Sequence, residues 1–211
     1  WDSVHLIGQS MGGLITQQMV QLYNERDKSV FKADDVCDLR SVTLFNTFIS
    51  FYHFPFGLPL LTTIRFVLKM PLKFTSSAVT KAVLQQMFSP NYFAAHYNEI
   101  EEKFKELFHG SQYSRFGSAK QLLGMLTHYN TPGNFVAQFS QLNRPVLIIC
   151  STADAMVAHR NSLEMHRLLT STKPTFDVTL EVIEGAGHIC MAEAASHVNS
   201  LLYKTWLLKH Q

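Results

Sequence analysis

The chain has 211 residues, of which 46% are hydrophobic and 16% are charged. This composition predicts a globular protein of roughly one to one and a half domains. The formal net charge of +2 comes without any cluster of basic residues, so it gives no reason to expect nucleic acid as a partner.

The first elements of the chain are predicted to be a strand, a tight turn and a helix. Ser3 to Ile7 is interpreted as a buried parallel strand, and Met11 to about Glu25 as a helix. The turn between them reads Gly8-Gln9-Ser10-Met11-Gly12. This pattern between a strand and a helix is typical of a nucleophile elbow, in which the serine backbone is strained and side chains at Gly8 and Gly12 would collide. It indicates that the hydroxyl of Ser10 stands clear of the sheet; the alternative is a chance match in a loop.

Strand-like and helix-like segments also alternate later in the chain, on either side of residues 47–143. Residues 24–38 are polar and are predicted to form a loop. Strands are predicted over 39–45, 145–150 and 178–183, and helices over 161–169 and 192–209. The run from Pro145 to Cys150 is almost wholly apolar, as in a strand covered on both faces. This order predicts the α/β class, with a parallel sheet flanked by helices.

Residues 47–143 do not show this alternation of strand-like and helix-like segments. They are rich in phenylalanine, and their apolar residues mostly recur with a helical period. Ser89-Pro90 is a favourable helix start. An apolar stripe follows it at spacings of four and three residues: Phe93, Tyr97, Ile100, Phe104 and Leu107. The charge pairs on that helix are interpreted as a solvated face: Glu99 with Lys103, and Glu101 with Lys105. We expect a core formed by residues 1–46 and 144–211, and a helical cap formed by residues 47–143.

A candidate for the remainder of a serine-based site lies after the later strands. A serine hydroxyl needs a general base within hydrogen-bond reach and a third group that orients the base. Asp154 follows the strand over 145–150, and His188 follows the last strand, after Gly185-Ala186-Gly187. The order serine, acid, histidine is that of a triad assembled at the carboxyl ends of parallel strands. The alternatives are a helix N-cap role for Asp154 and a packed loop position for His188.

Other titratable side chains give weaker signals. Asp177 and Glu184 are weaker candidates for the acid, and the histidines at 5, 159 and 166 are interpreted as strand, surface or helix residues. No histidine or carboxylate pair has the ligand spacing of a His-Glu-x-x-His site, so neither a metal nor a cofactor is expected. Of the three cysteines, Cys37, Cys150 and Cys190, none fits a metal or redox spacing. Cys150 in an apolar strand favours a reducing compartment, and Cys190 is interpreted as a packing residue.

The longest apolar stretch, residues 58–70, is the candidate for contact with a membrane. It is short for a membrane span and is interrupted by Arg65 and Lys69. Two interpretations stay open for it: peripheral membrane contact through the cap, and the lining of an apolar channel.

The residues Val4 to Gly13, together with Asp154 and His188, resemble the α/β-hydrolase superfamily, in particular its lidded serine-hydrolase branch. The resemblance implies that Ser10 is the nucleophile, His188 the general base and Asp154 the residue that orients it. It also implies that the backbone N–H of Met11 is one oxyanion donor and that the second donor belongs to a loop in N-terminal strands that this chain lacks. The chain would then be the C-terminal part of such a fold, with residues 47–143 as the lid.

His109-Gly110 is similar to the His-Gly pair of the oxyanion loop of that superfamily. It follows a charged helical segment in the middle of the chain. We interpret the glycine as a helix C-cap and not as part of an oxyanion site.

Patches of the chain are also similar to the maspardins, which are cytosolic α/β-hydrolase-like proteins. The patches are residues 44–48, 58–74, 126–130 and 190–207. This likeness implies cytoplasmic residence with some attachment to endosomal membranes, and a protein-binding role that needs no catalysis. His188 departs from the maspardin pattern and favours an enzyme.

Two hypotheses therefore lead. The first is a serine hydrolase of carboxylic esters, with a lipophilic acyl chain suggested by the phenylalanines at 51, 54, 56, 66 and 74. The second is a non-enzymatic adaptor that binds a protein partner. A carbon–carbon hydrolase or a peptidase on the same scaffold stays open, whereas a dehalogenase is disfavoured because its nucleophile is an aspartate. Without the first four strands of such a fold, the 211 residues alone are expected to be insoluble or inactive.

Overall fold

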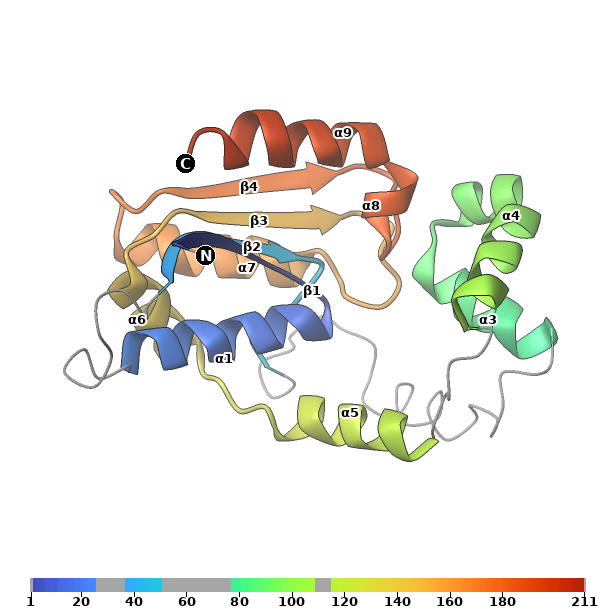
Figure 1. The fold of residues 1–211 in the computed structure, drawn as a ribbon, viewed down its shortest axis with the longest axis horizontal. Coiled ribbons are helices and arrows are strands. Elements are labelled where there is room, and N and C mark those ends of the chain that lie inside the picture. The colour runs from blue at the N-terminus through green and yellow to red at the C-terminus, as the bar shows by residue number, and fades with distance from the viewer. Residues whose placement is uncertain (1, 26–36, 51–76, 109–114, 211) are drawn as a thin grey trace.

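In the computed structural model, one parallel sheet lies between two layers of helices (Figure 1). The structure describes residues 2–25, 37–50, 77–108 and 115–210. Several predicted features lie outside these residues: most of the loop over 24–38, the five phenylalanines at 51–74, the stretch 58–70 and His109-Gly110.

The sheet contains β1 (Ser3–Gln9), β2 (Asp38–Phe45), β3 (Val146–Ser151) and β4 (Val178–Ile183). Its order is β1-β2-β3-β4, and all neighbouring strands are parallel. The carboxyl ends of the four strands therefore meet at one edge of the sheet. In open parallel sheets this edge is where ligands bind.

Helices cover both faces of the sheet. One face carries α1 (Met11–Glu25), α6 (Pro132–Leu142) and α7 (Arg160–Thr172). The other carries the C-terminal elements α8 (Cys190–Glu193), α9 (Ala195–Ser200) and η3 (Leu201–Leu207). The placement of α1 and α7 on one face follows from right-handed crossovers between strands that are added in sequence order.

Three further helices lie away from these layers. Figure 1 shows α3 (Ser77–Met87) and α4 (Pro90–Phe108) beyond the carboxyl edge of the sheet, and α5 (Arg115–Thr127) beyond α1. The apolar stripe of α4 packs on α3, with Phe93, Ile100 and Leu84 buried together. The hydroxyl of Ser89 accepts the backbone N–H of Tyr92 at 3.4 Å, and Pro90 begins the helix, as predicted.

The alternation of side chains along β3 explains the two-sided core. Val146 and Ile148 face the cluster formed with α1, α6 and α7. Leu147 and Ile149 face the cluster formed with Val198, Trp206 and the other C-terminal residues. Because successive strand residues point to opposite faces, a strand covered on both sides needs an unbroken apolar run. The prediction for this strand is confirmed.

The structure differs from the sequence predictions at two elements. The first strand was expected to be buried, but β1 is mostly half-exposed, and Ile7 is 44% exposed. The reason is that β1 has only β2 as a neighbour within the described sheet. The closing helix was expected to be continuous, but it breaks at Ala194, between α8 and α9.

The expected cap of residues 47–143 includes segments that pack in the core. Phe135 and Phe139 of α6 are fully buried in the cluster on the sheet, and residues 47–50, which follow β2, are buried as well. The described segments that lie apart from the sheet layers are thus α3, α4 and α5. None of the helices in the described part of the chain combines the length and the hydropathy of a membrane span.

Candidate active site

Ser10 lies in a sharp turn between β1 and α1. Its φ is 53°, a left-handed conformation that residues other than glycine disfavour. The backbone N–H of Ser10 donates to the carbonyl of Phe45 at 2.9 Å. The carbonyl of Ser10 accepts the N–H of Gly13 at 2.9 Å and the hydroxyl of Thr47 at 2.7 Å. These bonds hold the strained elbow that the sequence predicts.

The elbow glycines differ in why they are needed. A Cβ on Gly8 would lie 2.2 Å from Oγ1 of Thr16 and 2.4 Å from the carbonyl oxygen of Gly12. A Cβ on Gly13 would lie 2.4 Å from Oγ1 of Thr47. A Cβ on Gly12 would meet no heavy atom of the described residues within 4 Å. The predicted collision therefore exists at Gly8, whereas at Gly12 the described residues supply no atom for such a collision.

Asp154 and His188 form a buried pair at the same edge of the sheet. Nδ1 of His188 lies 2.7 Å from Oδ2 of Asp154, and their side chains are 5% and 0% exposed. The other carboxylate oxygen, Oδ1, accepts the backbone N–H groups of Met156 and Val157 at 2.7 and 2.8 Å. Asp154 is not the N-cap of α7, a position that His159 occupies. The carboxylate is thus fixed by its own loop and fixes the imidazole in turn.

The backbone of His188 is tied to the elbow. The side chain of Gln9, directly before Ser10, donates to the carbonyl of His188 at 2.8 Å. Nδ2 of Asn46, directly after β2, donates to the same carbonyl at 2.9 Å. The residue that carries the imidazole is therefore bonded to the neighbour of Ser10. Between the side chains of Ser10 and His188 themselves, both within the described residues, no hydrogen bond is formed.

Gln9 and Asn46 contact the candidate site, although the sequence did not single them out. Asn46 is 1% exposed and also donates to the hydroxyl of Ser151 at 3.1 Å. Its φ is 41°, so it turns the chain at the end of β2 much as Ser10 does at the end of β1. In the sequence, the feature that could have indicated Asn46 is its place as a polar residue directly after the apolar strand β2. Gln9 carries no comparable signal.

The weaker candidates for the acid contact other partners. Asp177 precedes β4 and lies 3.3 Å from Nζ of Lys209. Glu184 accepts the hydroxyl of Thr152 at 3.0 Å. Neither bonds to His188, so among the described carboxylates Asp154 is the one paired with this imidazole.

His5 and the buried cysteines lie outside the candidate site. Nδ1 of His5 lies 2.7 Å from the hydroxyl of Ser41, and burial, with a smaller effect of Arg40, lowers the pKa of His5. Burial raises the pKa of the Cys150 thiol to about 12 and also raises that of Cys190. Thiols that stay protonated are poor nucleophiles, so both cysteines act as packing residues. Within the described part of the chain, no cluster of histidine, cysteine or carboxylate side chains suits a metal ion.

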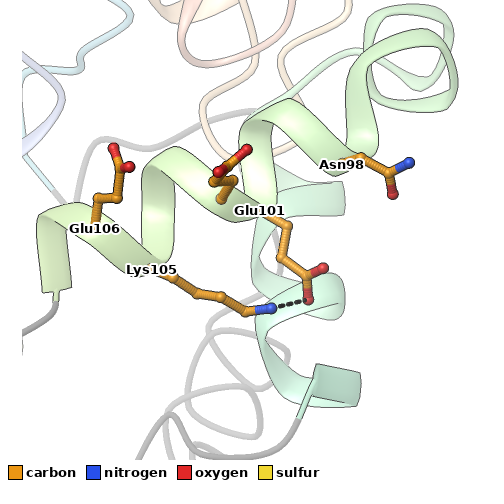
Figure 2. Close-up of a pocket in the computed structure, with 5 residues that line it drawn as sticks. Asn98, Glu101, Lys105 and Glu106 are labelled. Atoms are coloured by element: carbon orange, nitrogen blue, oxygen red, sulfur yellow. Dashed lines mark ion pairs between the residues drawn. The ribbon is translucent and has the colours of Figure 1, made fainter.

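A shallow hollow along α4 lies apart from these residues (Figure 2). It is lined by Asn98, Glu101, Glu102, Lys105 and Glu106. Nζ of Lys105 lies 3.3 Å from Glu101, and Nζ of Lys103 lies 2.6 Å from Glu99. The hydrogen bond from Lys103, more than its charge, lowers the pKa of Glu99. Both predicted charge pairs are confirmed, and the hollow is the solvated face of a helix.

Comparisons with known proteins agree with this architecture. The family model described as the alpha/beta hydrolase fold matches residues 1–195. A solved thermophilic esterase from Thermogutta terrifontis is 19% identical, with a TM-score of 0.70, over 100% of this chain and 66% of its own. A bromoperoxidase from Bacillus anthracis is 19% identical, with a TM-score of 0.66, over 95% of this chain and 66% of its own.

A third structure, the 2-hydroxy-6-oxo-6-phenylhexa-2,4-dienoate hydrolase from Rhodococcus sp. strain RHA1, is 18% identical, with a TM-score of 0.64, over 96% of this chain and 63% of its own. At such identities the similarity concerns the fold alone. The chain spans less than two thirds of the length of each of these three proteins. No curated protein matches the chain.

Proposed function

Because the chain belongs to the alpha/beta hydrolase fold family, we propose that it is a serine hydrolase that cleaves carboxylic esters with Ser10, His188 and Asp154. The observation that carries this proposal is the buried contact of 2.7 Å between His188 and Asp154. It lies at the edge of the sheet where the elbow presents Ser10. A strained serine, an imidazole and a carboxylate are the parts that this chemistry needs.

In the proposed reaction, Nε2 of His188 takes the proton of Ser10 while the serine oxygen attacks the ester carbonyl. The N–H of Met11, the first residue of α1, supplies one donor for the developing oxyanion. The imidazolium returns its proton to the leaving alcohol, which leaves an acyl group on Ser10. A water molecule, activated by the same imidazole, then releases the carboxylic acid. Asp154 keeps Nδ1 protonated throughout, so that Nε2 can accept the proton.

The acyl part of the substrate is proposed to be lipophilic. Support comes from the phenylalanines at 51, 54, 56, 66 and 74, in the part of the chain expected to form the cap. A series of p-nitrophenyl esters from acetate to palmitate tests this point. We expect kcat/KM to rise with chain length from acetate to octanoate, and a maximum at acetate would contradict the lipophilic assignment.

The central test is covalent labelling of the full-length protein with a fluorophosphonate probe. The wild type is expected to be labelled, and Ser10→Ala is expected to lose the label, because the serine oxygen forms the bond to phosphorus. Ser3→Ala, which changes a serine at the start of β1, is the matched control and should label like the wild type. A wild type without label, or equal labelling of Ser10→Ala, would refute the proposal.

A second candidate is an adaptor that uses the same fold to bind a protein partner in the cytosol or at endosomes. One observation favours it: the hydroxyl–imidazole hydrogen bond is not formed between Ser10 and His188. Catalytic hydrogen bonds often close only when a substrate is bound, so the labelling experiment distinguishes the two. The adaptor predicts a folded wild type that the probe does not label.

A further inference from the structure

The turn between α3 and α4 is bonded to the loop that carries His188. The carboxylate of Glu193, in α8, accepts the backbone N–H of Ser89 at 2.9 Å with Oε1 and the hydroxyl of Ser89 with Oε2. A third bond runs from the N–H of Ile189 to the carbonyl of Met87 at 3.0 Å. Oε1 of Glu193 also accepts the N–H of Gly187 at 2.9 Å. We call the contacts of this carboxylate with Ser89 and Gly187 the Glu193 bridge.

The two segments touch backbone to backbone. A Cβ on Gly187 would lie 2.4 Å from the backbone nitrogen of Ser89 and 2.6 Å from the carbonyl carbon of Phe88. Real side chains do not approach a backbone so closely, so the contact requires glycine at position 187. Ser89 is 3% exposed. The α3–α4 turn is therefore packed tightly against the residue that precedes His188.

The anchors of His188 come from two parts of the molecule. Its carbonyl and its Nδ1 are held by the core, through Gln9, Asn46 and Asp154. The residues on either side of it, at 187 and 189, are held by the Glu193 bridge and by the α3–α4 turn. Hydrogen bonds to an ionised carboxylate are about twice as strong as neutral ones. The carboxylate of Glu193 thus joins the loop and the α3–α4 turn at one point.

We propose that Glu193 is a positioning residue that couples the α3–α4 turn to the imidazole of His188. When the bridge is intact, the flanking residues hold the imidazole at the carboxyl edge of the sheet, toward Ser10. When α3 and α4 shift, the bridge transmits the shift to residues 187–189 and lowers the reactivity of Ser10. This inference rests on the proposed function, because its effect is on the reaction of Ser10.

The test compares Glu193→Gln, Ser89→Ala and the control Glu181→Gln in the full-length protein. Glutamine keeps the size of Glu193, but its amide nitrogen accepts no hydrogen bond, so the bridge loses an acceptor and its charge. Glu181 lies on β4 and pairs at the surface with Nε2 of His197 at 2.8 Å. Two quantities are measured: the maximal rate of Ser10 labelling at saturating probe, and backbone hydrogen exchange over residues 87–93 and 185–190.

We expect Glu193→Gln to lower the maximal labelling rate roughly 10-fold to 100-fold, since a small displacement of a catalytic base has effects of this size. Exchange should rise in both segments and stay unchanged in β3. Ser89→Ala, which removes one bond, should lower the rate roughly 5-fold. It keeps the inference testable if Glu193→Gln does not fold. The control should match the wild type in both measurements.

The outcomes separate the two proposals. If the wild type is labelled and neither bridge variant slows labelling, the positioning role is refuted and the serine hydrolase stands. If the wild type is not labelled, the proposed function fails, and with it the effect of Glu193 on Ser10. Exchange that stays unchanged in residues 185–190 of both variants refutes the coupling itself, whatever the labelling shows. Exchange that rises equally in β3 indicates general destabilisation and also counts against a positioning role.

Discussion

Ser10 adopts a left-handed backbone conformation that costs about 1–2 kcal/mol for a residue other than glycine. Hydrogen bonds to Phe45, Gly13 and Thr47 offset this cost. Close packing adds to them, since the backbone of the elbow folds back onto the space beside Gly8. At the scale of the residue, the site is a strained turn. Hydrogen bonds offset the strain, and the packing leaves no room for a side chain at Gly8.

Gly8→Ala is expected to lower the free energy of unfolding by roughly 1–3 kcal/mol, because the new methyl group must displace Thr16 or the carbonyl of Gly12. Gly12→Ala is the matched control, since its methyl group meets no described atom within 4 Å. We expect this control to change stability by less than about 0.5 kcal/mol. Urea unfolding of both variants measures the difference, and equal losses would contradict the steric argument.

Asp154→Asn tests the pair with His188. The asparagine oxygen still accepts the N–H groups of Met156 and Val157, so the loop is expected to fold. Its amide group, however, donates to Nδ1 and stabilises the wrong tautomer of the imidazole. Loss of tautomer control lowers kcat by roughly 1,000-fold to 10,000-fold in serine hydrolases, and we expect a similar loss in ester hydrolysis here. Glu184→Gln, a nearby carboxylate bonded to Thr152, is the control. Similar rates for the two variants would remove Asp154 from the triad.

At the scale of the element, α6 shows that a helix can belong to the core although the sequence around it is typical of a cap. Its N-terminus is defined by Thr131, whose hydroxyl accepts the N–H of Asn134 at 3.1 Å, and by Pro132. Its apolar face buries Phe135 and Phe139 in one cluster with Val20 of α1 and with residues of the sheet. Helical period alone does not distinguish a face that packs on a sheet from one that packs on other cap helices.

Phe139→Ala is therefore expected to destabilise the whole fold, by roughly 3–5 kcal/mol, because a fully buried ring leaves a cavity. Leu123→Ala on α5 is the control, since Leu123 is 59% exposed. Its expected effect is below about 0.5 kcal/mol. Thermal unfolding, monitored by circular dichroism, measures both variants. If Phe139→Ala lowered the free energy of unfolding by less than about 1 kcal/mol, the assignment of α6 to the core would be contradicted.

At the scale of the whole molecule, helices cover both faces of the described sheet, and β1 forms one of its edges. Within the described residues, β1 pairs only with β2. Beside it, α1 exposes an apolar stripe of Ile15, Met19 and Leu22, spaced by four and three residues. An open strand edge next to exposed apolar side chains is a site of self-association.

We expect the 211-residue chain, expressed by itself, to self-associate through this edge. Met19→Gln with Leu22→Gln should raise the monomer fraction in size-exclusion chromatography with light scattering, because both substitutions reduce the exposed apolar area. Leu163→Gln on α7 is the control, since Leu163 is 39% exposed and lies on another helix. A wild type that is monomeric at micromolar concentration would contradict this expectation.

The sequence by itself determined the elements and the elbow. Strand and helix periods are local properties, and β4 spans the predicted residues 178–183. The elbow follows from the sterics of five consecutive residues, and at Gly8 an added side chain would collide with described atoms. The sequence also singled out Asp154 and His188, because acids and histidines after parallel strands meet at one edge.

The tertiary structure alone decided what holds these residues together. That Asp154 and not Glu184 contacts His188, that Gln9 and Asn46 hold its backbone, and that Glu193 bonds to Ser89 all depend on contacts between residues distant in the chain. The same holds for the exposure of β1 and for the place of α6 in the core. Periodicity and turn chemistry act over a few residues, whereas these contacts arise from how the layers pack, and no local pattern encodes that packing.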